Sequence, residues 1–383
     1  MIPVWATQER NRADACDIVV VGGGLVGALT AARLAGEGFD TAVLEAQEVA
    51  AGATGCSAGF VVAGLPGHYN WMVATYGEEQ ARELWAMTAE GRDRLVDLAE
   101  KLMVPVERTG SLRLAVDDAE AQSLEESVVL LGEAGFRARF QPTDPLERGF
   151  RAVAYHGDDA IIDPVRLTKA VLADANVAAH PHTEVYSLQR EDDGLRVWAR
   201  GRNVLCDAVV LATNGYSPLF DTYFTGRVIP ARGLSLVADS GPDTPSGSDV
   251  ALDRPALADY GYEFCRRVSQ RRLLLGGWRR PEAAMTSGGE EDDLEDQTQK
   301  AVDAFAARYF PDVTIDRSNR SSGMLGLTED GLPLIGSLPA MPRVYFGVGL
   351  GGRGLSWAPI VSQRLIELML RDTDPGLLSA DRI

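Results

Sequence analysis

The sequence predicts an α/β fold of two interlocked domains, one built on a central parallel sheet and one on an antiparallel sheet. A chain of 383 residues is too long for one simple core. Short, continuous apolar runs such as 17–21 are typical of strands buried on both faces of a parallel sheet. The ranges 228–237, 262–268 and 272–278 have instead the pattern of strands in an antiparallel sheet.

The first unit is a strand, a glycine-rich turn and a helix. The run 17–21 leads directly into Gly22, Gly24 and Gly27, and apolar residues then recur at helical spacing through 25–37. In such a GxGxxG turn the first glycine permits the tight bend, the second lets the backbone approach a pyrophosphate, and the third packs helix on strand. The free N–H groups at the helix N-terminus favour an anion there.

A second buried strand at 41–44 ends in Glu45, about 20 residues after the turn, where a carboxylate can accept hydrogen bonds from ribose hydroxyls. The sequence therefore predicts a dinucleotide site. The turn alone fits both NAD and FAD. Three later segments favour FAD: the small-residue loop 50–59, the strand end 212–215 and the glycine-rich turn 349–355.

The predicted cofactor-binding residues come from these segments and from a strand at 184–188. They are Gly22, Gly24, Leu25, Val26, Gly27, Glu45, Ala46, Thr54, Ser57, Ala58, Gly59, Val185, Ala212, Thr213, Asn214, Gly215, Gly349, Gly351, Gly352, Arg353, Gly354 and Leu355. Cys56 lies in the same loop and could form a thioether to the cofactor. We expect it instead to fill a tight loop as a small residue, with FAD bound non-covalently.

The remaining elements are predicted from periodicity and from glycine, proline and polar breaks. Helices are expected at 78–102, with a candidate break at Gly91, and at 119–134, 165–175, 298–310 and 357–370. Strands are expected at 108–116, 184–188, 195–199, 207–211 and 344–348, and a solvated acidic loop at 288–296.

Charge and composition exclude several classes of function. The net charge of −18 argues against nucleic acid and anionic lipid as partners. It suits a cationic substrate, but it also suits simple solubility. Four scattered cysteines without a CxxC pair argue against a disulfide framework or a zinc cluster, and the His180 and His182 pair is a weak metal signal, so no metal is expected. Without a membrane-length apolar run or a signal-peptide core, we expect a cytoplasmic protein.

Taken together, the motifs resemble the D-amino acid oxidase-type flavoprotein superfamily, in its glycine and sarcosine oxidase group, over nearly the whole chain. The matching segments are 17–45, 52–59, 163–164, 211–215, 230–233, 276–277, 328–336 and 347–359. Segments 52–59 and 328–336 are most similar to the γ-glutamylputrescine oxidoreductase branch. The resemblance implies an FAD domain assembled from 1–64, 151–220 and 322–383, and a substrate domain from 65–150 and 221–321.

The activity that the resemblance implies is oxidation of a C–N bond in a small amine or amino acid. A hydride passes to flavin N5, the imine is hydrolysed, and O2 or another acceptor takes the electrons. This chemistry needs no acid–base dyad, and the sequence shows no convincing one. The alternatives are an α-amino acid oxidase or dehydrogenase with an arginine anchor, and a flavoprotein subunit of a heteromeric electron-transfer complex.

The chain departs from its relatives where they bind substrate. Leu325 stands where glycine oxidases have a carboxylate-binding arginine, and Ser356 where sarcosine oxidases have a lysine. Arg232 or Arg353 could replace these anchors with a bidentate contact. Arg353 could equally pack against flavin or an acidic neighbour.

Two further points concern the pocket over the flavin. Sarcosine oxidases place a lysine that assists reaction with oxygen in the strand matching 273–275, where this chain has leucines, so a dehydrogenase that passes electrons to another acceptor is an alternative to an oxidase. Tyr260, Tyr262 and Trp278 could line an apolar pocket or could be ordinary sheet packing. The carboxylates that could bind a distal ammonium, or be solvated loop charges, are Asp253, Asp259 and Glu263.

Overall fold

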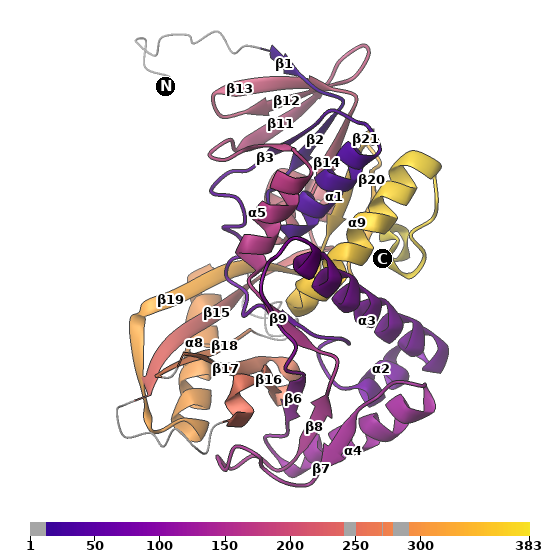
Figure 1. Cartoon of the computed structure of the whole chain (residues 1–383). Coiled ribbons are helices and arrows are strands. Elements are labelled where there is room, and N and C mark those ends of the chain that lie inside the picture. Colours follow the sequence, from indigo (N-terminus) through magenta and orange to yellow (C-terminus); the bar gives the residue numbers. More distant parts are fainter. Residues whose placement is uncertain (1–12, 241–249, 270, 279–290) are drawn as a thin grey trace.

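The structure is a computed structural model, and it describes residues 13–240, 250–269, 271–278 and 291–383. The molecule is elongated (Figure 1). A mainly parallel sheet with its helices forms one half, and a large, mainly antiparallel sheet forms the other. The division into domains that the resemblance implies stays a prediction.

The first half is centred on a six-stranded sheet in the order β10-β3-β2-β14-β21-β20. Its strands are β2 (Ile18–Val21), β3 (Thr41–Leu44), β10 (Ala178–His180), β14 (Ala208–Leu211), β20 (Leu334–Leu338) and β21 (Met341–Val348). All pairs are parallel except β20 with β21. The three segments that build this sheet lie far apart in the sequence.

Both faces of this sheet are covered. Along β2, Ile18 and Val20 pack into a core shared with the helices, whereas Val19 and Val21 pack into a core on the opposite face. The helices are α1 (Leu25–Gly36), α5 (Pro164–Asp174) and α9 (Gly354–Arg371), which lie together in Figure 1. A four-stranded sheet covers the second face, formed by β1 (Ala13–Ala15), β11 (Val185–Arg190), β12 (Leu195–Ala199) and β13 (Arg202–Cys206). This two-sided burial explains why β2 is apolar throughout.

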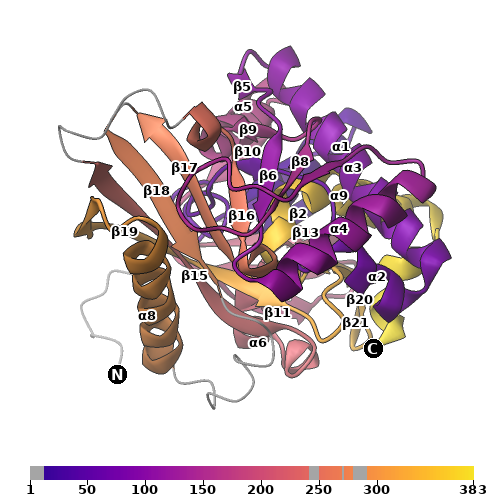
Figure 2. The same cartoon turned by 90° about the horizontal axis from the view of Figure 1, so that it is seen from below.

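The second half contains an eight-stranded sheet in the order β19-β15-β18-β17-β16-β6-β8-β7. The strands are β6 (Ser111–Leu114), β7 (Arg139–Gln141), β8 (Val153–His156), β15 (Ile229–Ser240), β16 (Ala256–Ala258), β17 (Glu263–Ser269), β18 (Arg272–Gly277) and β19 (Val313–Leu327). All pairs are antiparallel except β6 with β16. Helix α8 (Glu291–Tyr309) packs against β15 and β18, as Figure 2 shows.

Three further helices and a small sheet connect the halves. The helices are α2 (Tyr69–Tyr76), α3 (Glu78–Lys101) and α4 (Asp118–Glu133), and the sheet consists of β4 (Phe60–Val61), β5 (Val106–Glu107) and β9 (Ala160–Ile162). The expected break at Gly91 is wrong, because α3 is continuous there. A Cβ at Gly91 would lie 1.9 Å from the Ser356 oxygen, so this glycine allows α3 to approach α9 closely.

Several predicted elements needed correction. Residues 108–116 hold β6 rather than one long strand, since the chain turns at Gly110, whose φ is +70°. The acidic loop expected at 288–296 is also wrong from Glu291 onward, where α8 begins. Residues 288–290 lie outside the described residues. Sequence patterns missed β13, β20 and the 15-residue β19, whose polar stretch lacks the apolar alternation of a strand but pairs with β15.

Candidate functional site

A cavity of about 630 Å³ lies between the two halves. Its wall includes Glu45 and Val185 from the first half and Leu257 and Trp278 from the large antiparallel sheet. The glycine turn after β2 and the turn after β21 also line it. This is the edge at which parallel strands of an open α/β sheet commonly bind ligands, at their carboxyl ends.

The turn between β2 and α1 can only be made of glycine at two of its positions. Gly22 has φ +108°, and a Cβ there would lie 2.7 Å from the Ala212 oxygen. A Cβ at Gly27 would lie 2.0 Å from the Gly22 oxygen. This tight packing fixes the path of the turn, and the N-terminus of α1 lies at the cavity as a result.

The N-terminus of α1 offers a site for an anion. Gly24 is the N-cap and makes no side-chain capping bond, and the first turn carries no acidic residue. The N–H of Leu25 donates to Thr54 Oγ1 at 3.1 Å, and both residues line the cavity. A phosphate would find backbone donors, a hydroxyl and the positive end of the helix dipole here.

Glu45 is placed at the same end of the cavity. Its Oε2 accepts a hydrogen bond from the Gly23 N–H at 2.7 Å, and its Oε1 accepts one from the Gln47 N–H at 2.8 Å. These two bonds orient the carboxylate. Because each oxygen has a second lone-pair site, the group can still accept hydrogen bonds from ribose hydroxyls.

Asn214 ties together the ends of two neighbouring parallel strands, β14 and β21. Its φ is +45°, and its Oδ1 accepts hydrogen bonds from the N–H groups of Gly349 and Leu350, both at 3.2 Å. A Cβ at Gly215 would lie 2.4 Å from the Leu325 oxygen, so the next residue is also closely packed. The two strand ends therefore form one joined wall.

Most of the predicted cofactor residues meet at this cavity. Those that line it are Gly22, Gly24, Leu25, Val26, Glu45, Ala46, Thr54, Ser57, Ala58, Val185, Ala212, Thr213, Asn214, Gly351, Gly352, Arg353, Gly354 and Leu355. Gly27, Gly59, Gly215 and Gly349 are not in the lining, and a Cβ at each would collide with neighbouring atoms. Backbone donors, a ribose-type carboxylate and a long cavity fit FAD.

The predicted substrate residues divide in two. Trp278, Leu325 and Arg353 line the cavity, whereas Arg232, Tyr260 and Tyr262 do not. Arg232 instead lies beside β19, with Nη1 3.4 Å from Ser322 Oγ. Tyr260 stacks on His68 with ring centroids 4.9 Å apart, and Tyr262 packs on Trp278 at 4.7 Å. These three residues are therefore not among those that line the cavity.

Of the other residues singled out in the sequence, Asp253, Glu263 and Ser356 lie outside the lining. Asp253 pairs with Arg267 at 3.2 Å. Glu263 is only 4% exposed, so it is not a solvated loop charge. Ser356 donates to the Val62 oxygen at 2.7 Å and is buried. Cys56 does line the cavity, and its thiol donates to the Ser322 oxygen at 3.0 Å.

Arg353 is the strongest electrostatic feature of the wall. It is 6% exposed, and neither Nε nor Nη2 has a hydrogen-bond partner among the described residues. Burial, and then the charge of Arg113, lower the pKa of Arg353 to about 9, against the pull of Asp159 and Tyr262. A buried cation with free donors requires an anion. The sequence left open that Arg353 pairs with an acidic neighbour, but no acidic side chain among the described residues accepts a hydrogen bond from Nε or Nη2.

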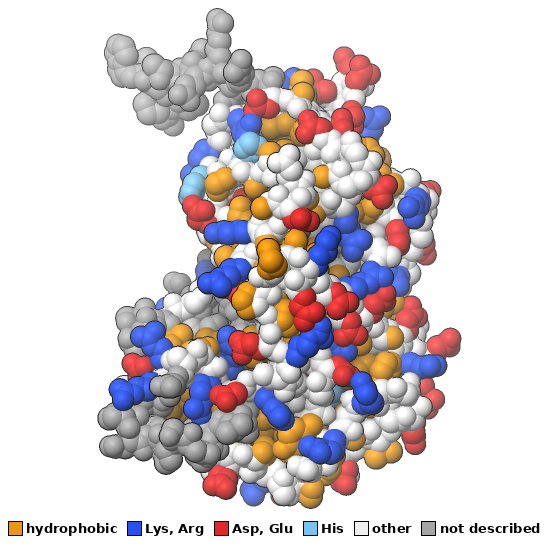
Figure 3. Space-filling model, in the orientation of Figure 1, with side chains coloured by type: hydrophobic (Ala, Val, Ile, Leu, Met, Phe, Trp, Pro, Cys, Tyr) orange, Lys and Arg blue, Asp and Glu red, His pale blue; other side chains and the backbone are white. Residues whose placement is uncertain are grey.

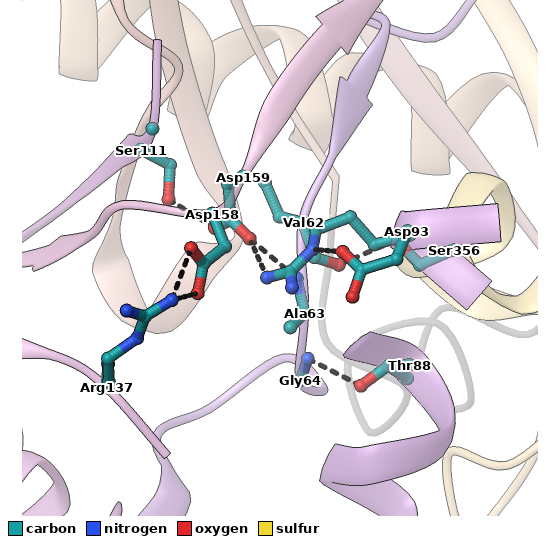
Figure 4. A network of polar contacts seen from close by, with 12 residues as sticks. Val62, Ala63, Gly64, Thr88, Asp93, Ser111, Arg137, Asp158, Asp159 and Ser356 are labelled. Atoms are coloured by element: carbon teal, nitrogen blue, oxygen red, sulfur yellow. Dashed lines mark hydrogen bonds and ion pairs between the residues drawn. The ribbon is translucent and has the colours of Figure 1, made fainter. Parts of the chain in front are cut away.

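Asp159 is already occupied by other groups. Its carboxylate accepts hydrogen bonds from the Ala63 N–H, from Arg92 Nη1 at 3.1 Å and from Ser111 Oγ at 2.6 Å. Figure 4 shows how this network joins the segment 62–64 to β9 and to the start of α9 at Ser356. Asp159 therefore attracts Arg353 through its charge but does not bind Nε or Nη2 of Arg353.

Sequence reasoning missed the apolar part of the wall. Phe60, Leu257 and Phe264 line the cavity, as do Gly261 and the exposed Leu219. None of these residues belongs to a motif, so the sequence did not mark them as lining residues, although Phe264 lies in the predicted strand 262–268. No lysine or histidine occurs among the described residues of the lining.

Neither a metal-binding cluster nor a membrane-spanning helix occurs in the described part of the chain. It contains no group of three or more histidine, cysteine, aspartate or glutamate residues that could hold a metal ion. Nor does it contain a helix long and apolar enough to cross a membrane.

The fold and the cavity define a flavoprotein in which a large antiparallel sheet faces a dinucleotide site. The chain belongs to the DAO family, since the family model described as FAD dependent oxidoreductase matches residues 17–368. It is therefore an FAD-dependent oxidoreductase.

Curated relatives match along nearly the whole chain. γ-Glutamylputrescine oxidoreductase of Escherichia coli K12 is 23% identical over 380 residues, covering 95% of this chain and 86% of the relative. Glycine oxidase of Pseudomonas aeruginosa is 25% identical over 362 residues, covering 92% and 94%.

Solved structures support the fold. Glycine oxidase from Geobacillus kaustophilus superposes with a TM-score of 0.70 at 19% identity, covering 97% of this chain and 100% of the other. L-amino acid deaminase from Proteus vulgaris gives a TM-score of 0.74 at 14% identity, covering 98% and 99%. These likenesses confirm the two-domain flavoprotein fold that the sequence predicted.

Proposed function

We propose that this enzyme oxidises the C–N bond of an amino acid whose carboxylate is bound by Arg353. The observation that supports this most directly is the buried guanidinium of Arg353 in the cavity wall, with Nε and Nη2 free of hydrogen-bond partners. A carboxylate matches that fork in charge and geometry. The relatives named glycine oxidase and L-amino acid deaminase indicate substrates of the same kind.

The cofactor would be held mainly by backbone groups. We infer that the N-terminus of α1 and Thr54 bind the pyrophosphate, that Glu45 binds the ribose, and that the turn 351–355 contacts the flavin. When bound, FAD supplies the redox chemistry, with flavin N5 accepting a hydride from the carbon beside the amine. The imine product is then hydrolysed in water.

The chain contributes binding, orientation and exclusion of water. Arg353 would fix the carboxylate, while Leu257, Phe264 and Trp278 provide an apolar wall around the reacting carbon. With no lysine or histidine among the described lining residues, the substrate ammonium would lose its proton to solvent before reaction.

Matched pairs of compounds test this proposal. The purified holoenzyme is mixed anaerobically with glycine or methylamine, sarcosine or dimethylamine, each enantiomer of alanine or ethylamine, L-proline or pyrrolidine, and putrescine. Each decarboxylated twin lacks only the group that Arg353 would bind. We expect the flavin band to bleach with at least one amino acid, and about 100-fold more slowly with its twin, as expected when a buried charged partner is lost.

Three outcomes would overturn the proposal. Equal bleaching by both members of every pair would show that no carboxylate is recognised. Bleaching by putrescine alone would favour an amine oxidoreductase. Bleaching by none of them, with a second chain co-purifying, would favour an electron-transfer subunit. Readmitting air then distinguishes an oxidase from a dehydrogenase, since rapid reoxidation of the flavin indicates an oxidase and slow reoxidation a dehydrogenase.

A further inference from the structure

A short turn, Asp259–Gly261, has an unusual backbone. Its three residues have φ values of +48°, +56° and +86°, so all of them lie in the left-handed region. Only the third is glycine. An aspartate and a tyrosine rarely adopt this conformation, and they keep it only when surrounding contacts impose it.

Glu120 of α4 provides one of those contacts. Its side chain is fully buried, its Oε1 accepts a hydrogen bond from the Tyr260 N–H at 2.5 Å, and its Oε2 accepts one from the Val116 N–H at 2.8 Å. The Tyr260 carbonyl in turn accepts a hydrogen bond from the Gly67 N–H at 2.7 Å. Both backbone groups of the strained tyrosine are thereby held.

His68 completes this clamp. Its Nε2 lies 3.2 Å from Glu120 Oε1, and its ring packs on that of Tyr260. Burial lowers the pKa of His68 despite the nearby carboxylate, so the neutral ring donates its Nε2 hydrogen to Glu120. Glu120, His68 and Gly67 therefore hold the turn from outside the large sheet.

The turn presses against Arg353. A Cβ at Gly261 would lie 2.5 Å from Arg353 Nη2, so the glycine itself is in contact with the guanidinium. The next residue, Tyr262, packs on Trp278, and Trp278 abuts the turn that carries Arg353, since a Cβ at Gly352 would lie 2.4 Å from its ring. The turn thus limits where the guanidinium can point.

We propose that Gly261 and Glu120 are positioning residues for the substrate carboxylate. Glu120 holds the left-handed turn, and the turn places Gly261 so that the Arg353 fork faces the cavity. This inference rests on the proposed role of Arg353 as the carboxylate anchor. Neither residue touches the reacting atoms, so their substitution should change carboxylate affinity more than turnover.

Gly261→Ala is the direct test. The Kd of the holoenzyme for benzoate and for acetate is measured by calorimetry, with the flavin absorbance recorded to confirm cofactor loading. We expect the Kd to rise at least about tenfold, because a charge-assisted contact is misaligned. Gly77→Ala is the control for adding a methyl group at a glycine with positive φ: it has φ +81°, no atom within 4 Å of its Cβ position, and a place outside the cavity lining.

Glu120→Gln is the second test, for the case in which Gly261→Ala fails to fold. The glutamine keeps the size of the side chain but turns an N–H donor toward one of the two backbone N–H groups. We expect a rise in benzoate Kd of about three- to tenfold. Glu126→Gln, on the exposed side of the same helix, is its control.

Arg353→Met separates this inference from the proposed function. If Arg353→Met leaves benzoate and acetate binding unchanged, the anchor itself is wrong and the proposed function fails. If it weakens binding while Gly261→Ala and Glu120→Gln do not, the positioning role alone is overturned. In the Arg353→Met background, Gly261→Ala should have no further effect on the Kd, and a full additional loss would show that it does not act through Arg353.

Discussion

The two turns that line the cavity are built in opposite ways. The turn at Gly22–Gly27 uses glycine wherever the backbone is left-handed or closely packed, and presents backbone N–H groups. The turn at Asp259–Gly261 places an aspartate and a tyrosine in the left-handed region and needs Glu120 to hold them. The first is encoded by neighbouring residues, whereas the second depends on contacts from a distant helix.

The electrostatics of the two regions differ in the same way. At the cofactor end the charged groups are Glu45 and Glu184, and a helix N-terminus favours anions. At the other end the charge is a single buried guanidinium, Arg353. The outer surface differs from both, since acidic and basic side chains are interspersed over the face in Figure 3. The net charge of the chain therefore says little about the charge inside its cavity.

The largest effect is expected in the glycine turn. Gly27→Ala places a Cβ 2.0 Å from the Gly22 oxygen, and because that atom is backbone it cannot move aside cheaply. We expect purified protein without bound flavin, measured as the ratio of visible to ultraviolet absorbance. Gly36→Ala in the same helix, with nothing near its Cβ position, should retain full loading. A yellow Gly27→Ala protein would show that the turn is more tolerant than the geometry indicates.

An intermediate effect is expected from the pH dependence of Arg353, the residue that the turn at Asp259–Gly261 contacts. The Arg353 cation is present below its pKa of about 9 and is lost above it, unlike that of an exposed arginine. The ratio of kcat/KM for an amino acid to that for its decarboxylated twin should therefore fall about tenfold per pH unit in the alkaline range, because kcat/KM reports the free enzyme. Each kcat/KM is expressed per concentration of the neutral amine before the ratio is taken, so that the different titrations of the two substrate amines do not enter it.

Arg113→Met sharpens this prediction. Removing the repulsion from Arg113 should raise the pKa of Arg353 and move the alkaline limb to higher pH. A ratio that stays constant across the alkaline range in the unsubstituted enzyme would contradict the assignment of Arg353 as the anchor.

The smallest effect is expected at Glu45. Glu45→Gln keeps one acceptor oxygen but loses the negative charge and one of the two oxygens that accept hydrogen bonds from the Gly23 and Gln47 N–H groups. We expect the Kd for FAD to rise about three- to tenfold, measured by titrating apoprotein with FAD and following flavin fluorescence. Glu184→Gln, at the same end of the cavity, serves as the comparison. An unchanged Kd for FAD in Glu45→Gln would contradict the proposal that Glu45 binds the ribose.

Prediction from sequence succeeded where chemistry is encoded locally. The strand 17–21, the turn at Gly22–Gly27 and the acid Glu45 lie within about 30 residues, and βαβ geometry brings them together without further information. It failed for β19, whose polar residues are held in a strand only by pairing with β15. It also failed for Arg232, whose neighbour Ser322 lies on that same unpredicted strand.

By itself, the sequence determined the class of fold, the dinucleotide turn and the family, because each depends on short-range periodicity or on motifs that carry their own backbone requirements. Only the tertiary structure showed that Arg353 lies in the cavity wall and Arg232 does not, and that a turn contacts the Arg353 guanidinium. The physical reason is that burial and the lack of hydrogen-bond partners are properties of an assembled interior. Arg113 and Glu120 lie far along the chain from Gly261, and Gly261 lies far from Arg353, so these residues meet only when both halves of the molecule have folded.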